Sequence, residues 1–143
     1  MRKKLYTYLS SDGTLSGIVV GGWHQPNSIT SEHQPKKPFG IVRLSEVPFL
    51  VSPDADAQRV IADIYVYDRF RKVDGQMIAS YLDIDSALER IYALMNRHQL
   101  DVTDYGWGIG HFEFDMTSED AIDDGWNCIF KYSRYTCMVM RGR

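Results

Sequence analysis

The clearest hydrophobic pattern in the chain predicts an amphipathic helix over residues 84–99. Its apolar residues recur at spacings of three and four, which places them on one side of a helix with 3.6 residues per turn. These residues are Ile84, Ala87, Leu88, Ile91, Leu94 and Met95. Asp83, Asp85 and Ser86 are expected to cap the first turn, because their oxygens can accept hydrogen bonds from its free amides. Ser86 and Glu89 also fit a capping box.

A strand is predicted after the helix, from Trp107 to Met116, because apolar and polar residues alternate there with a period of two. Phe112, Phe114 and Met116 are expected to share one face. The other face would carry Trp107, Ile109, His111, Glu113 and Asp115. Three glycines alternate at its start, which indicates a bulge or the close approach of another chain segment. These glycines are Gly106, Gly108 and Gly110.

Shorter alternating segments, separated by turn-forming residues, predict further strands. The expected strands are 3–10, 16–22, 39–44, 58–70, 77–82, 126–132 and 135–140, with an edge piece at 47–51 and a turn at 52–56. The first two strands would form a hairpin, as would the last two. The strand 58–70 would pair with 77–82 across the turn at Val73-Asp74-Gly75. The proline-rich segment between Trp23 and Pro38 is expected to be a long loop.

This order of elements favours a single α+β domain over residues 1–143. A chain of 143 residues can bury a core of its own. Most of the expected strands are joined by turns, and one strong helix lies between them. We therefore predict a mostly antiparallel β-sheet with one main α-helix, at about 84–99, packed on one face.

Charge and composition narrow the class of partner. The chain has 16 basic and 19 acidic residues, a net charge of −3, and its basic clusters are short, which argues against nucleic-acid binding. An apolar run of signal-peptide or transmembrane length is absent from the sequence. Cys128 and Cys137 lie among apolar residues, and we expect them to be buried and reduced. These features predict a cytoplasmic protein that does not bind membranes.

The polar face of the strand 107–116 suggests one kind of chemical site. His111, Glu113 and Asp115 alternate, so their side chains would project together, about 6.6 Å apart between neighbours. An imidazole and two carboxylates could bind a divalent metal or act as an acid/base pair. His24 and His33 could add ligands if the long loop folded over this strand. The simpler explanation is that this face is polar because it contacts water.

The function that we favour from the sequence is protein binding without a cofactor. The chain is rich in tyrosine and tryptophan, carries net negative charge and has no specific catalytic motif, so aromatic anchors and acidic steering groups could recognise a basic protein. An inhibitor or immunity-type protein that neutralises a toxin or nuclease would fit. The expected contact residues are Trp23, Trp107, Glu119, Asp120, Asp123, Asp124 and Trp126. The alternatives are the enzyme or metal site above and a structural homo-oligomer that pairs exposed strand edges.

Overall fold

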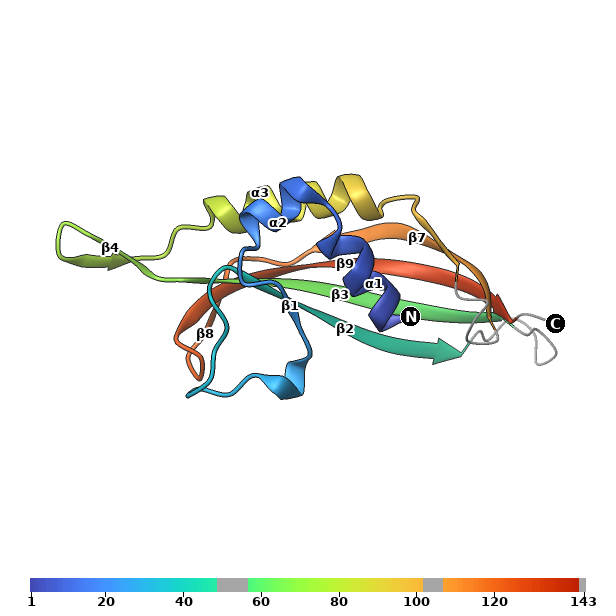
Figure 1. Cartoon of the computed structure of the whole chain (residues 1–143), viewed down its shortest axis with the longest axis horizontal. Coiled ribbons are helices and arrows are strands. Elements are labelled where there is room, and N and C mark those ends of the chain that lie inside the picture. The colour runs from blue at the N-terminus through green and yellow to red at the C-terminus, as the bar shows by residue number, and fades with distance from the viewer. Residues whose placement is uncertain (49–56, 102–106, 142–143) are drawn as a thin grey trace.

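The computed structural model describes residues 1–48, 57–101 and 107–141, apart from the side chains of 46–48, 57–58, 107, 140 and 141. This part of the chain forms one α+β domain, with a curled seven-stranded sheet and α-helices packed on one of its faces (Figure 1). The strand order is β1 (Trp23–His24), β2 (Phe39–Pro48), β3 (Ala57–Arg69), β9 (Cys128–Arg141), β7 (Trp107–Thr117) and β6 (Gln99–Asp101), with β8 (Ala121–Asp123) also beside β9. β1 and β2 are parallel, and the other pairs are antiparallel, so the predicted fold class is confirmed.

The main helix is α3, Leu82–Met95, which confirms the strongest sequence prediction. It ends four residues before the predicted boundary, because Asn96 is already extended and Arg97 takes a left-handed conformation with φ of 64°. The predicted caps are wrong. The N-cap position is Tyr81, with no side-chain hydrogen bond to the first turn. Asp83 and Asp85 instead lie inside that turn, where they pair with cations from other elements.

The predicted N-terminal hairpin is wrong, because this segment forms two helices, α1 (Arg2–Ser10) and α2 (Gly13–Ile18). Leu5 and Leu9, both fully buried, are four residues apart, a spacing that fits a helix face and a strand face equally well. Asp12 starts α2, since its side chain accepts a hydrogen bond from the Leu15 amide at 2.8 Å. No helix among the described residues is long and apolar enough to cross a membrane.

The predicted C-terminal hairpin is also wrong, because β9 is a single strand of 14 residues. Ser133 and Arg134 looked like its turn, but both lie within the sheet. The Ser133 side chain is buried and shares a hydrogen bond with Thr117. Arg134 donates to the carboxylate of Asp63 on β3, at 2.8 and 3.2 Å. Contacts with β3 and β7 therefore provide partners for the polar side chains of Ser133 and Arg134, and the strand continues through them.

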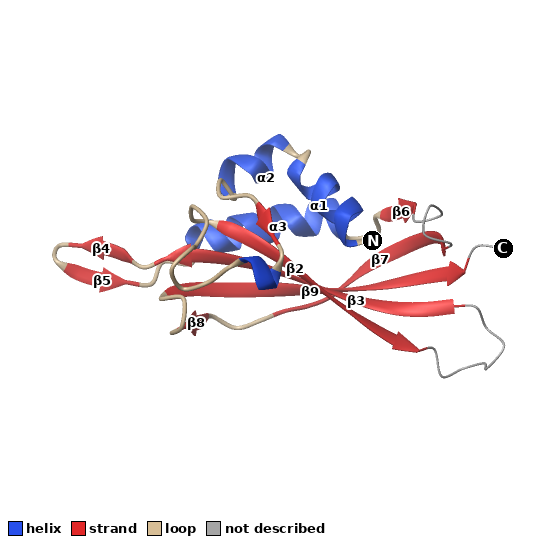
Figure 2. Ribbon diagram, turned by 60° about the horizontal axis from the view of Figure 1, so that its bottom comes forward, coloured by secondary structure: helices blue, strands red, loops and turns tan. Residues whose placement is uncertain are grey.

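The strand predicted at 58–70 is present as β3, but its predicted pairing with 77–82 is wrong. β2 and β9 occupy both edges of β3, so no edge is left for a third strand. The chain after β3 forms a separate two-stranded ribbon of β4 (Arg71–Val73) and β5 (Gln76–Ile78), which projects beyond the sheet (Figure 2). Its turn is at Asp74-Gly75, as predicted.

The strand β7 confirms both the predicted strand and its irregularity. The β7–β9 register shifts between Trp107 and Gly110, and a Cβ at Gly110 would lie 2.6 Å from the Cys137 sulfur. A second shift, between Phe114 and Met116, corrects the predicted faces. Thr117 joins Phe112 and Phe114 on the helix side, while Met116 pairs with Arg134 and turns to the other side.

The main core lies between the helices and the sheet. Its central side chains include Leu9, Ile64, Ile91 and Phe112. A smaller cluster on the opposite face contains Phe39, Tyr67 and Cys128 with Ile29 from the long loop. This loop contains β1 and a short 3₁₀ helix, Pro26–Ser28. The turn predicted at 52–56 lies outside the described residues.

Candidate functional site

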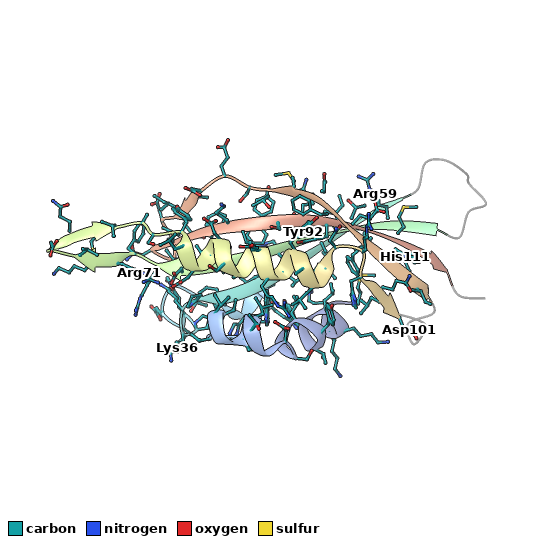
Figure 3. All side chains as sticks on the ribbon, turned by 90° about the horizontal axis from the view of Figure 1, so that it is seen from above. Lys36, Arg59, Arg71, Tyr92, Asp101 and His111 are labelled. Carbon is teal, nitrogen blue, oxygen red and sulfur yellow. The ribbon has the colours of Figure 1, made fainter. Side chains whose placement is uncertain are left out.

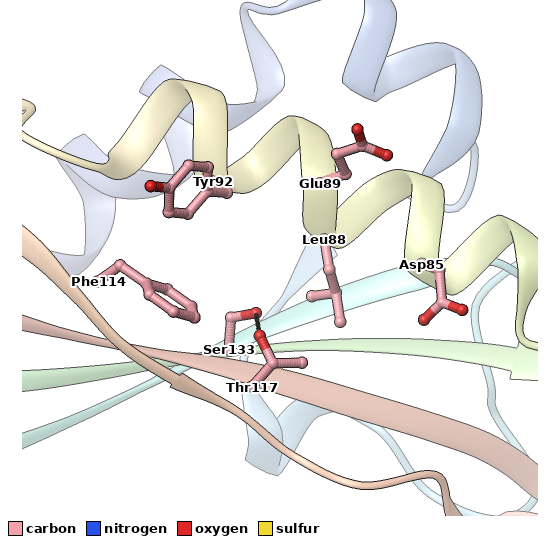
Figure 4. A pocket seen from close by; sticks show the side chains of 7 residues that line it. All are labelled: Asp85, Leu88, Glu89, Tyr92, Phe114, Thr117 and Ser133. Atoms are coloured by element: carbon pink, nitrogen blue, oxygen red, sulfur yellow. Dashed lines mark hydrogen bonds between the residues drawn. The ribbon is translucent and has the colours of Figure 1, made fainter.

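A groove of about 440 Å³ lies between α3 and the strands β7 and β9 (Figure 4). The lining residues are Asp85, Leu88, Glu89 and Tyr92 from α3, Phe114 and Thr117 from β7, and Ser133 from β9. The α3 residues are spaced by three and four, so they fall on one side of the helix. The alternation of β7, with its shift before Met116, brings Phe114 and Thr117 to the same groove. The helix and the bulged strand together therefore form the site.

Two aromatic side chains give the groove an exposed apolar wall. Tyr92 is 45% exposed and Phe114 is 39% exposed, and their rings meet edge to face with centroids 5.2 Å apart. Phe114 also contacts the buried Tyr135, at 5.7 Å between ring centroids. Leu88 is buried at the same site. Aromatic rings of this kind supply large contact areas in protein interfaces.

Carboxylates surround one end of the groove. Lys131 donates a 2.7 Å hydrogen bond to Asp85 and lies 3.6 Å from a carboxylate oxygen of Asp120. The hydrogen bond to Asp85 raises the pKa of Lys131, which keeps it charged. Glu89 is exposed and has no ion-pair partner among the described residues. One ammonium group thus faces two carboxylates, and with the exposed Glu89 at the rim the groove carries local negative charge.

The hydroxyl groups of the groove show no catalytic arrangement. Thr117 and Ser133 hydrogen-bond each other at 3.0 Å. The seven lining residues include no histidine or cysteine. A serine nucleophile is usually activated by a base within hydrogen-bond distance, and the partner of Ser133 here is a second hydroxyl. This geometry suits binding better than covalent chemistry.

The structure places only part of the predicted acidic surface beside this groove. Asp120 is linked to it through Lys131, and the exposed Glu119 is its neighbour in the chain. Asp123 has a local role, since its side chain accepts a hydrogen bond from the Trp126 amide at 2.9 Å. Asp124 is exposed in the turn between β8 and β9. Of these four acids, Asp120 is therefore the one that a described contact links to the groove.

The tryptophans predicted as contact residues lie apart. Trp126 is half-buried in the smaller cluster, with its ring 5.1 Å from that of Tyr67. Trp23 is half-buried at the border of the main core, and its indole covers Gly40 so closely that a Cβ there would lie 2.3 Å from the ring. The side chain of Trp107 is outside the described part of the structure. The two described tryptophans thus belong to different clusters.

The predicted metal-binding residues are also on the wrong side for this groove. His111 and Glu113 are exposed on the face opposite the helices, and the shift after Phe114 interrupts the alternation at Asp115. The His24 Nε2–H donates to the Gly21 carbonyl at 2.7 Å, and His33 is exposed on the loop. Among the described residues, no group of three histidine, cysteine or acidic side chains could hold a metal ion.

Sequence reasoning missed Glu89 and Tyr92 as site residues, and it assigned Asp85 only a capping role. All three lie outside the apolar stripe of the helix, where exposed side chains are ordinary. The one available signal was Tyr92, an aromatic residue on the side of the helix that does not face the core.

A scan against protein-family models finds no match for this chain, and a search of curated proteins finds no relative.

Proposed function

We propose that this chain is a protein-binding domain, and that its α3–β7 groove holds a basic segment of another protein. The observation that carries this proposal is the combination of two exposed rings, Tyr92 and Phe114, with the adjoining carboxylates of Asp85, Glu89 and Asp120. The rings can bury an apolar side chain of the partner, and the carboxylates can bind a neighbouring lysine or arginine.

The two parts of the groove have different energetic roles. Buried aromatic anchors carry most of the binding energy in protein interfaces. Exposed charges mainly increase the association rate and select partners of opposite charge. A partner that fits must therefore present a large apolar side chain beside basic ones. Removal of a ring should accelerate dissociation, and removal of the carboxylates should slow association.

An inhibitor or immunity-type protein is the class that we favour for this domain. Proteins that act on nucleic acids carry basic surfaces because they contact phosphates. An acidic groove is complementary to such a surface and could cover it. The net charge of −3 for the chain supports the same direction of attraction. The partner would thus be a basic toxin or nuclease, held by direct binding.

The proposal is tested by association kinetics with a partner captured from the lysate of the protein's own host. The triple variant D85N/E89Q/D120N removes the carboxylates around the groove, and E32Q removes an exposed carboxylate that does not line it. The triple variant should associate more slowly at low salt, and the difference should shrink as salt is added, because the Debye length is about 10 Å at 0.1 M. Equal association rates for wild type and triple variant at low salt would contradict the proposal.

A further inference from the structure

The β4–β5 ribbon exposes more apolar surface than its own strands can cover. Met77 is 61% exposed on one face of the ribbon, and Val73 and Ile78 are 47% and 41% exposed on the other face. The two strands pair only with each other among the described residues. An isolated two-stranded ribbon is marginally stable in water, and exposed apolar patches commonly mark interaction sites. The ribbon is therefore expected to pack on another surface.

The charges on the ribbon are complementary to those of the groove. Lys72 and Met77 are directly opposite in the β4–β5 register, so an ammonium group and an apolar side chain share one face. The groove presents the matching pair, the exposed carboxylate of Glu89 and the rings of Tyr92 and Phe114. If this face of the ribbon lay in the groove, Lys72 could pair with Glu89 and Met77 could contact the two rings.

The ribbon leaves the molecule at the point where α3 begins. Arg71, at its root, pairs with Asp83 in the first turn of α3 and lies 3.8 Å from the buried Asp68. From this root the ribbon runs away from the body while α3 runs in the opposite direction (Figures 1 and 3). The ribbon therefore extends away from the groove of its own molecule. A twofold axis at the root, perpendicular to the long axis, would place it along α3 of a second copy.

We propose that two copies of this chain form a dimer by exchanging their β4–β5 ribbons, each of which lies in the α3–β7 groove of the other copy. Such an interface is isologous, so every contact occurs twice. Leu82 supports the position of the axis. It is the first residue of α3 and is 76% exposed, the largest value among the described large hydrophobic side chains. The axis at the root brings the two copies of Leu82 towards each other.

The dimer has one consequence for the proposed function. The ribbon of the second copy and the basic segment of a partner protein would compete for the same groove. Dimer formation requires no other protein. Only the competition for the groove rests on the proposed function. Self-association is measured on the purified chain, so a failure of either proposal can be recognised separately.

Charge reversal tests the exchange directly. K72E places a carboxylate on the ribbon, and E89K places an ammonium group in the groove. Each change converts two attractive contacts per dimer into repulsive ones, so each variant should dissociate about tenfold more readily, which corresponds to about 1.4 kcal/mol. In a mixture of the two variants, the reversed ribbon meets the reversed groove and the unchanged ribbon meets the unchanged groove. The mixture should therefore form heterodimers of wild-type strength.

Sedimentation velocity over a concentration series gives the readout, with circular dichroism to confirm that each variant is folded. E32K and K3E serve as charge-matched controls at exposed positions outside the groove and ribbon, and they should dimerise like the wild type. M77D, which places a charge at the apolar contact, should be monomeric. A wild-type chain that stays monomeric at its solubility limit would overturn the proposal. So would a dimer that K72E and E89K do not weaken, or a mixture that fails to restore it.

Discussion

Arg90 on α3 donates two hydrogen bonds to the carboxylate of Asp12, at 3.0 and 2.7 Å, across a separation of 78 residues. The same carboxylate caps α2 through the Leu15 amide. These interactions lower the pKa of Asp12 to about 2, with the hydrogen bond from Arg90 as the largest cause. One ionised side chain thus starts α2 and fixes it against the main helix.

The Asp12–Arg90 pair predicts how the free energy of unfolding changes at acid pH. The pKa of Asp12 is lower in the folded chain than its ordinary value of 3.8, so its contribution is fully present above that value and is lost as the pH falls towards 2. The variant D12N should be less stable than wild type at neutral pH and should lose less stability across this interval. Urea unfolding at a series of pH values measures this. The control D124N should follow the wild type, and an unchanged profile for D12N would contradict the assignment.

The hydroxyl of Tyr135 predicts a stabilising substitution. It is buried and has no hydrogen-bond partner among the described residues, and burial raises the pKa of Tyr135, so it stays neutral. Removal of an unsatisfied buried polar group should increase the free energy of unfolding by about 1 kcal/mol in Y135F. The matched control is Y81F, whose hydroxyl donates to the Ala121 carbonyl at 2.8 Å, and which should lose about 1 kcal/mol. Chemical denaturation that ranks the two variants in the reverse order would show that the Tyr135 hydroxyl has a partner.

Gly110 predicts a specific clash with Cys137. An added Cβ would lie 2.6 Å from the Cys137 sulfur, so G110A should destabilise the fold by about 1–3 kcal/mol. Among the described residues the next atom, the Leu100 carbonyl oxygen, is 3.7 Å from that position, so C137A should relieve part of the cost. A double-mutant cycle of unfolding free energies should then show that G110A/C137A loses less than the sum of the single changes. Additive losses would place the strain elsewhere.

The two thiols predict a simple chemical test of burial. Burial raises the pKa of Cys128 to about 11 and that of Cys137 to about 12. The thiolate is the reactive form, so neither should react with an aromatic disulfide reagent in the native protein at neutral pH. Both should react once the chain is unfolded in denaturant. Rapid reaction of one thiol before unfolding would show that its side chain is accessible.

The elements predicted correctly from the sequence are those whose apolar residues repeat with either the helical or the strand period, but not both. The stripe from Ile84 to Met95 fits only a helix, and the alternation along β7 fits only a strand. Leu5 and Leu9 fit both periods, and the core selected the helix. Ser133 lies between the two strands predicted for the last hairpin, but its pairing with Ile64 and its hydrogen bond with Thr117 hold it inside β9. The local pattern was therefore enough to predict α3 and β7, whereas tertiary packing determined α1 and β9.

The groove could not be predicted in the same way because its parts come from separate elements. Tyr92 and Phe114 meet only when α3 crosses the bulged half of β7. Lys131 connects Asp85 with Asp120, two acids that are far apart in the sequence. Acidic and aromatic recognition stays a prediction, and of its residues Asp120 lies 3.6 Å from Lys131, which pairs with Asp85 of the groove. Trp126 and Asp123 meet in the turn before β9, but Trp23 packs at the border of the main core.

The most direct test of the groove is a comparative affinity capture from the host lysate, with quantitative mass spectrometry. The wild-type chain, the groove variant Y92A/F114A and the control Y6F, whose hydroxyl contacts the His24 carbonyl on another side of the fold, would be used as baits under the same conditions. We expect a basic protein to be retained by the wild type and by Y6F, and to be lost from Y92A/F114A while that variant remains folded. Retention of the same proteins by all three baits would show that the groove is not the binding site.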